Sequence, residues 1–218
     1  IVNDPAARYL RSYFPDIPNI VKASMGDLDN VTIDGQSHTV TSRYVEERFF
    51  DIFPVEFLFG LETGQALPPN TGVITEQAAM RLYNRLDVVG ERLLVDNEYD
   101  VAIAAVVKRP ESPSHLDSGV TLFSSDFYFP MEIRDNANRR RRIAAGVDPD
   151  ADQWANQSSY VYIEIPEDME FDQESFHQEL NEFVQATLPE DLRDSQTYEL
   201  IPINQLVMTT LAFVTAGF

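Results

Sequence analysis

Residues 160–203 read YVYIEIPEDMEFDQESFHQELNEFVQATLPEDLRDSQTYELIPI and carry the strongest evidence for a fold class. Aromatic and β-branched residues at 160–165 predict a strand that ends at Pro166. Asp172 is a typical helix N-cap, and the apolar residues after it recur at helical spacing, which predicts a long helix. Residues 197–203 predict a closing strand. A strand, a helix and a strand in this order predict a β-α-β unit with a right-handed crossover.

The sequence before this unit alternates between strand and helix patterns. The Asp-Gly pair at residues 34–35 predicts a hairpin between two short strands. After Ser42, a possible N-cap, apolar residues at intervals of three and four predict a helix that ends at Pro54. Thr75 is a second candidate N-cap, and residues 99–107 are apolar enough for a central strand. These alternating patterns predict an α+β fold in which helices cover one face of the sheets.

Two stretches interrupt both periodicities and are candidate boundaries. Residues 64–72 are rich in Gly and Pro, and residues 124–157 form a polar excursion without a clear pattern. We expect two subdomains on this basis. The predicted division assigns residues 1–64 and 155–205 to a discontinuous first α+β subdomain that contains the β-α-β unit, residues 65–154 to a smaller mixed subdomain inserted between them, and residues 206–218 to a tail.

Composition excludes several classes of protein. The 218 residues include 36 acidic and 16 basic side chains, a net charge of -20 that repels nucleic acid. Cysteine is absent, which excludes a disulfide framework and a thiol site. No stretch reaches the roughly 18 consecutive apolar residues that a membrane-spanning helix needs. The uncharged tail comes nearest, and we interpret it as a last strand or trailing arm, with a truncated membrane helix as the alternative.

Short pieces of sequence between residues 49 and 203 form an ordered set. The set consists of FFDIF (49–53), FLFG (57–60), VITEQAAMRL (73–82), DVVGERL (87–93), the strand at 99–107, PSHL (113–116), Trp154, YVYI (160–163) and LIPI (200–203). In this order the pieces resemble the periplasmic core domain of MacB-type ABC transporter permeases, relatives of the FtsX-like permeases. The resemblance covers about residues 20–205, and only residues 139–152 and the tail lack a counterpart.

The resemblance implies a location and a set of partners. It places the domain on the periplasmic side of the bacterial inner membrane, between two membrane helices of a permease whose ATP is hydrolysed on a separate module. The implied partners are the rest of the permease and its ATPase, periplasmic partner proteins, and a second permease in a membrane dimer. It implies a two-part domain that transmits ATP-driven motion and docks partners or substrate, with no catalytic, cofactor or metal residues.

Two other classes of function are weighed against this one. A free-standing extracytoplasmic ligand-binding module would need an apolar pocket with a few convergent polar groups. A hydrolase would need a nucleophile and a base, and the nearest candidates are Ser114, His115 and Asp117. These three are too close in sequence to align as a triad, so a turn is the favoured interpretation. His38 and His177 have no second ligand at metal-binding spacing.

An acidic stretch partly copies a calcium loop. Asp148, Asp150 and Asp152 match its first three ligand positions. Gln153 stands where the loop needs Gly, and Ser159 stands where it needs a bidentate Glu. A solvated acidic loop is therefore favoured over a calcium site.

Four adjacent arginines are the least expected local feature in so acidic a chain. They could bind the chain's own acidic residues, an acidic partner or lipid headgroups. Aromatic residues just before them could form an exposed contact patch or part of the core. The candidate partner-contact residues are therefore Arg139, Arg140, Arg141, Arg142, Phe127 and Tyr128.

Overall fold

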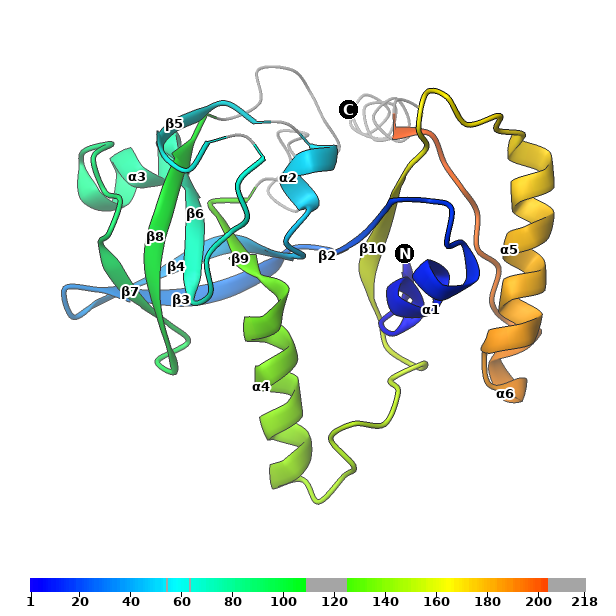
Figure 1. The fold of residues 1–218 in the computed structure, drawn as a ribbon. Coiled ribbons are helices and arrows are strands. Elements are labelled where there is room, and N and C mark those ends of the chain that lie inside the picture. The colour runs from blue at the N-terminus through cyan, green and yellow to red at the C-terminus, as the bar shows by residue number, and fades with distance from the viewer. Residues whose placement is uncertain (54, 63, 109–124, 204–218) are drawn as a thin grey trace, which may run out of the picture.

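The computed structural model describes residues 1–53, 55–62, 64–108 and 125–203 (Figure 1). Within these ranges the chain has a mixed α+β fold, in which a barrel-like sheet, three outer strands and six helices pack together. The predicted α+β class is confirmed. The predicted turn at residues 113–117 and the tail at 206–218 lie outside the described residues. Among the described residues, no helix is long and apolar enough to cross a membrane.

Six strands close into the barrel. They are β3 (Asp27–Ile33), β4 (Gln36–Val45), β6 (Thr71–Thr75), β7 (Arg92–Val95), β8 (Tyr99–Val107) and β9 (Phe127–Pro130). They follow the order β4-β3-β7-β8-β6-β9, and β9 pairs back with β4. The β6–β8 and β4–β9 pairs are parallel and the others are antiparallel, so the barrel is mixed. A seventh strand, β5 (Phe57–Gly60), pairs with β8 from outside this circuit.

Three outer strands extend from the barrel. They are β2 (Asn19–Ser24), β10 (Gln157–Glu164) and β1 (Val2–Asn3), arranged antiparallel in this order from β4. β10 pairs with β2 along six residues, whereas β2 meets β4 at the single pair Ala23↔Val45. In Figure 1, β2 accordingly runs from the barrel on the left to the outer strands on the right.

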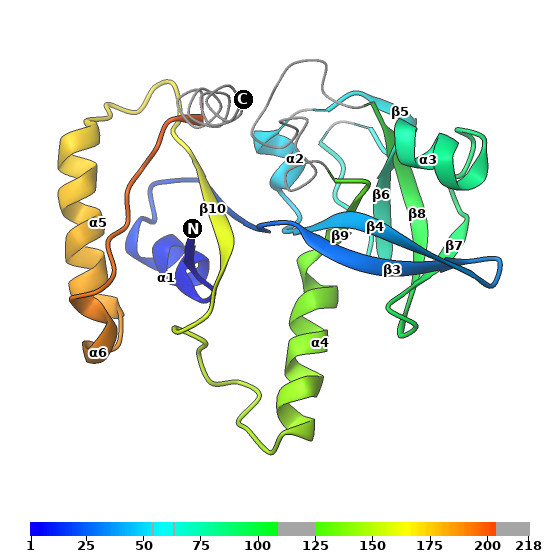
Figure 2. The ribbon, with the colours of Figure 1, turned by 180° about the vertical axis from the view of Figure 1, so that it is seen from behind.

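The helices fall into two groups, visible from behind in Figure 2. With the outer strands lie α1 (Ala6–Tyr13), α5 (Gln173–Thr187) and α6 (Glu190–Arg193); with the barrel lie α2 (Phe49–Ile52), α3 (Glu76–Tyr83) and α4 (Met131–Ala144). The Thr75 hydroxyl accepts a hydrogen bond from the Ala78 amide at 3.3 Å, and the Asp172 carboxylate accepts one from Ser175 at 2.8 Å. Both predicted N-caps are therefore confirmed.

The predicted closing strand at residues 197–203 is wrong. This segment contains no strand and runs beside α5 (Figure 1). The Leu200 amide donates to His177 Nε2 at 2.9 Å, and Tyr198 is buried against Phe183, with ring centroids 6.1 Å apart. Because α5 side chains satisfy backbone groups that a sheet would otherwise pair, the apolar segment stays extended without joining β10.

The predicted helix after Ser42 is also largely wrong, although the hairpin at residues 34–35 is confirmed. Ser42 lies in β4, and only Phe49–Ile52 forms a short helix. The β3–β4 pairing continues through Asp27↔Ser42, and the Ser42 hydroxyl donates to Asp29 within it. Ser42 also pairs with Phe127 on β9, so pairing with a distant strand overrides a local helical spacing.

The polar excursion at residues 124–157 is more ordered than its pattern predicts. It contains β9 and the 14-residue helix α4, of which only Met131 and Ile133 are buried. A helix that buries so little carries no apolar stripe, so the hydrophobic periodicity could not reveal it.

Candidate functional site

The molecule has three hydrophobic cores, which draw their residues from different segments of the chain. The terminal core draws its buried residues only from positions 6–20 and 154–198, and the barrel core draws them only from positions 31–133. The third, which we call the joint core, mixes both sources. Its buried members are Val21, Ala23, Val45, Phe49, Phe50, Val73, Ala105, Val107, Tyr128 and Tyr162.

Aromatic rings connect the two sides of the joint core. Tyr162 on β10 packs edge-on against Phe53, with ring centroids 4.6 Å apart, and against Phe49 at 6.1 Å. Phe49 also contacts Tyr128 on β9 at 5.9 Å. Because these rings come from both sides, the joint is held by nondirectional packing as well as by the short β2–β4 pairing.

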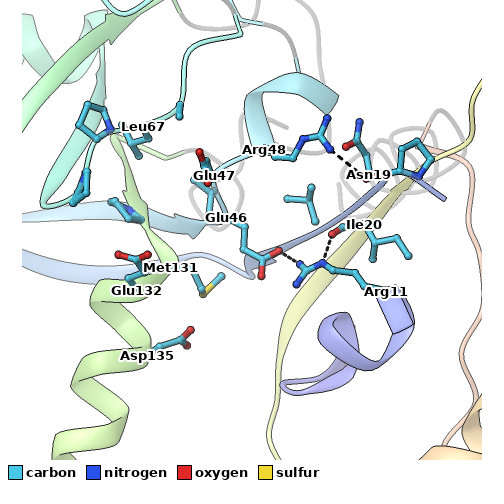
Figure 3. A pocket seen from close by; sticks show the side chains of 17 residues that line it. Arg11, Asn19, Ile20, Glu46, Glu47, Arg48, Leu67, Met131, Glu132 and Asp135 are labelled. Carbon is cyan, nitrogen blue, oxygen red and sulfur yellow. Dashed lines mark hydrogen bonds and ion pairs between the residues drawn. The ribbon is translucent and has the colours of Figure 1, made fainter. Parts of the chain in front are cut away.

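A groove follows the other face of this joint. Along β2, Ala23 lies in the joint core and Lys22 lines the second cavity, whereas Val21 belongs to the joint core and also lines the first cavity. The first of its two cavities has a volume of about 630 Å³ (Figure 3). It is lined by Arg11, Pro18, Asn19, Ile20, Val21, Val45, Glu46, Glu47, Arg48, Ala66, Leu67, Pro68, Pro69, Pro130, Met131, Glu132 and Asp135.

Polar contacts cross the first cavity. In Figure 3, Arg11 reaches from α1 to Glu46, with which it forms an ion pair, and its Nε donates to the Ile20 carbonyl at 2.8 Å. The Glu46 carboxylate also accepts from the Lys22 amide at 2.7 Å. Arg48 donates to the Pro18 carbonyl at 3.2 Å. The two arginines therefore fasten the α1–β2 segment to the start of α2.

The second cavity, of about 490 Å³, continues the groove past α4 and shares Arg11, Glu46 and Asp135 with the first. Lys22 is 8% exposed, and its ammonium lies 3.7 Å from Asp4 and 3.8 Å from Asp135. Partial loss of water raises the pKa of the Asp135 carboxyl, and the Lys22 charge opposes that shift.

The four predicted contact arginines occupy the last turns of α4, and most have partners within the chain. Arg139 pairs with Asp150, and Arg140 pairs with Glu98 at 3.0 Å while stacking over Tyr99. Arg142 donates to the Asp148 carbonyl at 2.8 Å. Arg141 has only a 3.3 Å hydrogen bond to Asn138 among these described contacts.

Phe127 and Tyr128 do not form an exposed patch. Phe127 is 0% exposed in the barrel core, and Tyr128 is 5% exposed in the joint core. Both lie on β9 between β4 and β6, where Phe127 packs in the barrel core and Tyr128, on the opposite face of the strand, packs in the joint core. Their predicted role as surface contacts is corrected to a role in packing.

Two carboxylates of the acidic stretch that resembles a calcium loop form ion pairs with arginines. Asp150 pairs with Arg139, and Asp152 pairs with Arg8 and accepts from the Tyr9 hydroxyl at 2.6 Å. Across the described ranges, no group of three His, Asp or Glu side chains is arranged to hold a metal ion. His38 lies on β4, His177 bonds the Leu200 backbone, and His115 lies outside those ranges.

Sequence reasoning did not identify the groove. Its walls come from residues as distant as Arg11 and Asp135, which no local spacing brings together. One indication was available, because Lys22 is the single charged residue in β2, between apolar neighbours. A buried lysine needs carboxylate neighbours, which would have predicted acidic partners from other segments.

Comparisons with known proteins agree with this fold. Residues 2–169 match the family described as the MacB-like periplasmic core domain. Comparison with curated protein sequences finds no match. The family match confirms the resemblance to MacB-type core domains and their periplasmic location that the sequence predicted.

Solved structures of transporter domains share the architecture. A domain of a proposed permease protein from Porphyromonas gingivalis is similar with a TM-score of 0.63 and 16% identity, over 94% of this chain and 85% of that chain. The periplasmic region of MacB from Actinobacillus actinomycetemcomitans gives 0.62 and 14%, over 96% and 82%. The extracellular domain of the noncanonic ABC-type transporter YknZ from Gram-positive bacteria gives 0.52 and 12%, over 90% and 86%. The chain belongs to the family of MacB-like periplasmic core domains.

Proposed function

We propose that this domain transmits ATP-driven motion of the permease's membrane helices by changing the angle between two subdomains, and that it is not itself catalytic. The separation of the terminal core from the barrel core carries this proposal. Two bodies with their own cores can move as units, and the joint then absorbs the change.

The subdomain boundary follows from the cores. Residues up to about Ser24, together with residues from Trp154 onward, form the terminal subdomain, and the barrel with α4 forms the second. We propose a first boundary near Gly26, where the sequence predicted residues 64–72, because β3 and β4 pair within the barrel. We propose the second boundary before Trp154, because Trp154 belongs to the terminal core.

The partners in this proposal are the rest of the permease, its ATPase, and a second permease in a membrane dimer. Periplasmic proteins or substrate would contact the surface whose shape the joint controls. The net charge of -20 argues against nucleic acid as a partner. A free-standing ligand-binding module is the alternative, and the groove would serve it equally as a binding site.

A cleavable cross-link across the joint tests the transmission role in the full permease. Arg11→Cys with Glu46→Cys places two thiols across the groove, and this chain contains no native cysteine. A short bis-methanethiosulfonate should stop transport while ATP binding persists, and dithiothreitol should restore transport.

A matched pair within the terminal subdomain is the control. Gln157 and Gln196 lie 2.5 Å apart through their side-chain amides, so Gln157→Cys with Gln196→Cys accepts the same reagent without bridging the joint. Cross-linking this pair should leave transport intact. Normal transport by the cross-linked Arg11/Glu46 pair would refute the transmission role.

A further inference from the structure

We propose that the groove binds an extended segment of a partner polypeptide. One part of this segment carries basic side chains beside an apolar side chain, and a later part carries acidic side chains beside a second apolar side chain. This inference rests on the proposed function and names the kind of partner that the domain docks. The lining of the two cavities and the charges left without partners support it.

The first cavity offers an apolar floor. Ile20, Val45 and Met131 line it and are almost fully buried, and Leu67 and Pro130 line it and are partly buried. A volume of about 630 Å³ accommodates one or two apolar side chains with the backbone that carries them.

Unpaired acidic side chains surround that floor. Both arginines of the first cavity already form ion pairs within the chain. Arg11 pairs with Glu46, and Arg48 pairs with Asp51 at 3.1 Å. Glu47 and Glu132 are exposed and have no ion pair or hydrogen bond with any described residue. In Figure 3 they lie on different elements, Glu47 near α2 and Glu132 on α4. Basic side chains on either side of an apolar one would meet both carboxylates.

The charge pattern reverses in the second cavity. Within the described chain, Arg141 contacts only the neutral Asn138 side chain, and Arg142 contacts a neutral carbonyl, so neither guanidinium has a carboxylate partner. The two cavities share Arg11, Glu46 and Asp135 in their walls and therefore adjoin each other. A ligand that fills both cavities must be long enough to place its basic groups beside Glu47 and its acidic groups beside the arginines of α4. An extended polypeptide, at roughly 3.3 Å per residue, meets this requirement.

Such an occupant would bridge the joint. Ile20 belongs to the β2 side of the groove, whereas Met131 and Glu132 belong to α4 on the barrel side. A segment in contact with both sides binds best at one joint angle, so partner binding and the subdomain angle are coupled.

A neutral peptide tests this without the bias of the chain's net charge. The probe is Lys-Leu-Lys-Gly-Ser-Gly-Asp-Leu-Asp with blocked ends, and its charges cancel. Methyl-labelled methionine reports binding, because Met131 lies on the groove floor whereas Met80 lies on α3 and is 47% exposed. The peptide should shift the Met131 methyl resonance and leave that of Met80 in place.

Two double variants separate the groove from diffuse electrostatics. Glu47→Lys with Glu132→Lys should weaken the Kd about tenfold or more by replacing attraction with repulsion. Glu182→Lys with Glu199→Lys changes the net charge equally at exposed positions away from the groove, and should leave the Kd within about twofold. Circular dichroism should show that all variants keep the fold.

Several results would overturn the inference. These are no Met131 shift at millimolar peptide, equal losses in both double variants, or equal binding of the scrambled Lys-Leu-Asp-Gly-Ser-Gly-Lys-Leu-Asp. Equal binding of Lys-Leu-Lys alone would show that a short cation suffices and would refute the extended segment. A negative peptide result combined with a transport block by the Arg11/Glu46 cross-link would refute this inference and leave the transmission role standing.

Discussion

The Lys22 ammonium lies 3.8 Å from the Asp135 carboxylate and so connects β2 of the terminal side with α4 of the barrel side. Asp4 lies 3.7 Å from the same ammonium and links it to the segment before α1. Because Lys22 is almost fully buried, its charge depends on these two carboxylates for compensation.

Replacing Lys22 with Met should destabilise the joint. The Lys22→Met change leaves Asp4 and Asp135 facing each other without a cation, and we expect a loss of about 1–3 kcal/mol in the free energy of unfolding. Urea denaturation at neutral pH measures this. Arg85→Met, which removes an exposed partner of Glu91, is the control and should cost less than about 1 kcal/mol. Equal losses in the two variants would contradict a special role for Lys22.

The joint core should control how cooperatively the two cores unfold. Tyr162→Ala removes a ring that packs against Phe53 and Phe49, and should cost about 3–5 kcal/mol. Trp154 is the chain's single tryptophan and lies in the terminal core, so its fluorescence reports that core alone. We expect the fluorescence and far-ultraviolet dichroism transitions to separate in Tyr162→Ala and to coincide in Tyr162→Phe. Coincident transitions in both variants would show that the joint core does not couple the two parts.

Asp29 should make stability depend on pH. Its carboxylate accepts from the Tyr44 hydroxyl at 2.8 Å inside the barrel, and burial raises the pKa of Asp29 above its ordinary value of 3.8. The folded state then binds more protons than the unfolded state, so this group's contribution to stability falls as pH rises above about 4.

The Asp29→Asn variant should remove this dependence. Subtracting its unfolding free energy from that of the native chain should give a difference that decreases between pH 4 and neutrality. Urea titrations at several pH values provide the comparison. A difference that stays constant or grows with pH would show that the sign is wrong.

Gly60 should be intolerant of any side chain. It has a φ of +90°, and a Cβ there would lie 2.0 Å from the Ala104 carbonyl oxygen across the β5–β8 pair. Gly60→Ala should therefore lower stability by more than about 2 kcal/mol. Gly35→Ala shares a positive φ but meets no atom within 4 Å, so it should cost only about 1–2 kcal/mol. Thermal unfolding of both variants isolates the steric contribution, and equal shifts in Tm would argue against it.

Local patterns predicted the segments whose partners are close in sequence. Thr75 and Asp172 cap helices as expected, because a cap depends only on the next three residues. The strand predicted at residues 99–107 is confirmed as β8. The closing strand at 197–203 failed because its backbone binds His177 on α5, a contact that no periodicity contains.

The sequence by itself determined the α+β class, the caps at Thr75 and Asp172, the hairpin at residues 34–35 and the family resemblance, since each depends on neighbouring residues or on their order. Only the tertiary structure decided that Ser42 belongs to a strand, that Phe127 and Tyr128 are buried, and that the four arginines end a helix. It alone brought Arg11, Lys22, Glu46 and Asp135 to one groove. Barrel closure pairs Ser42 with Phe127, and the outer strands pair Ser24 with Ser159. Local patterns carry no information about such distant contacts.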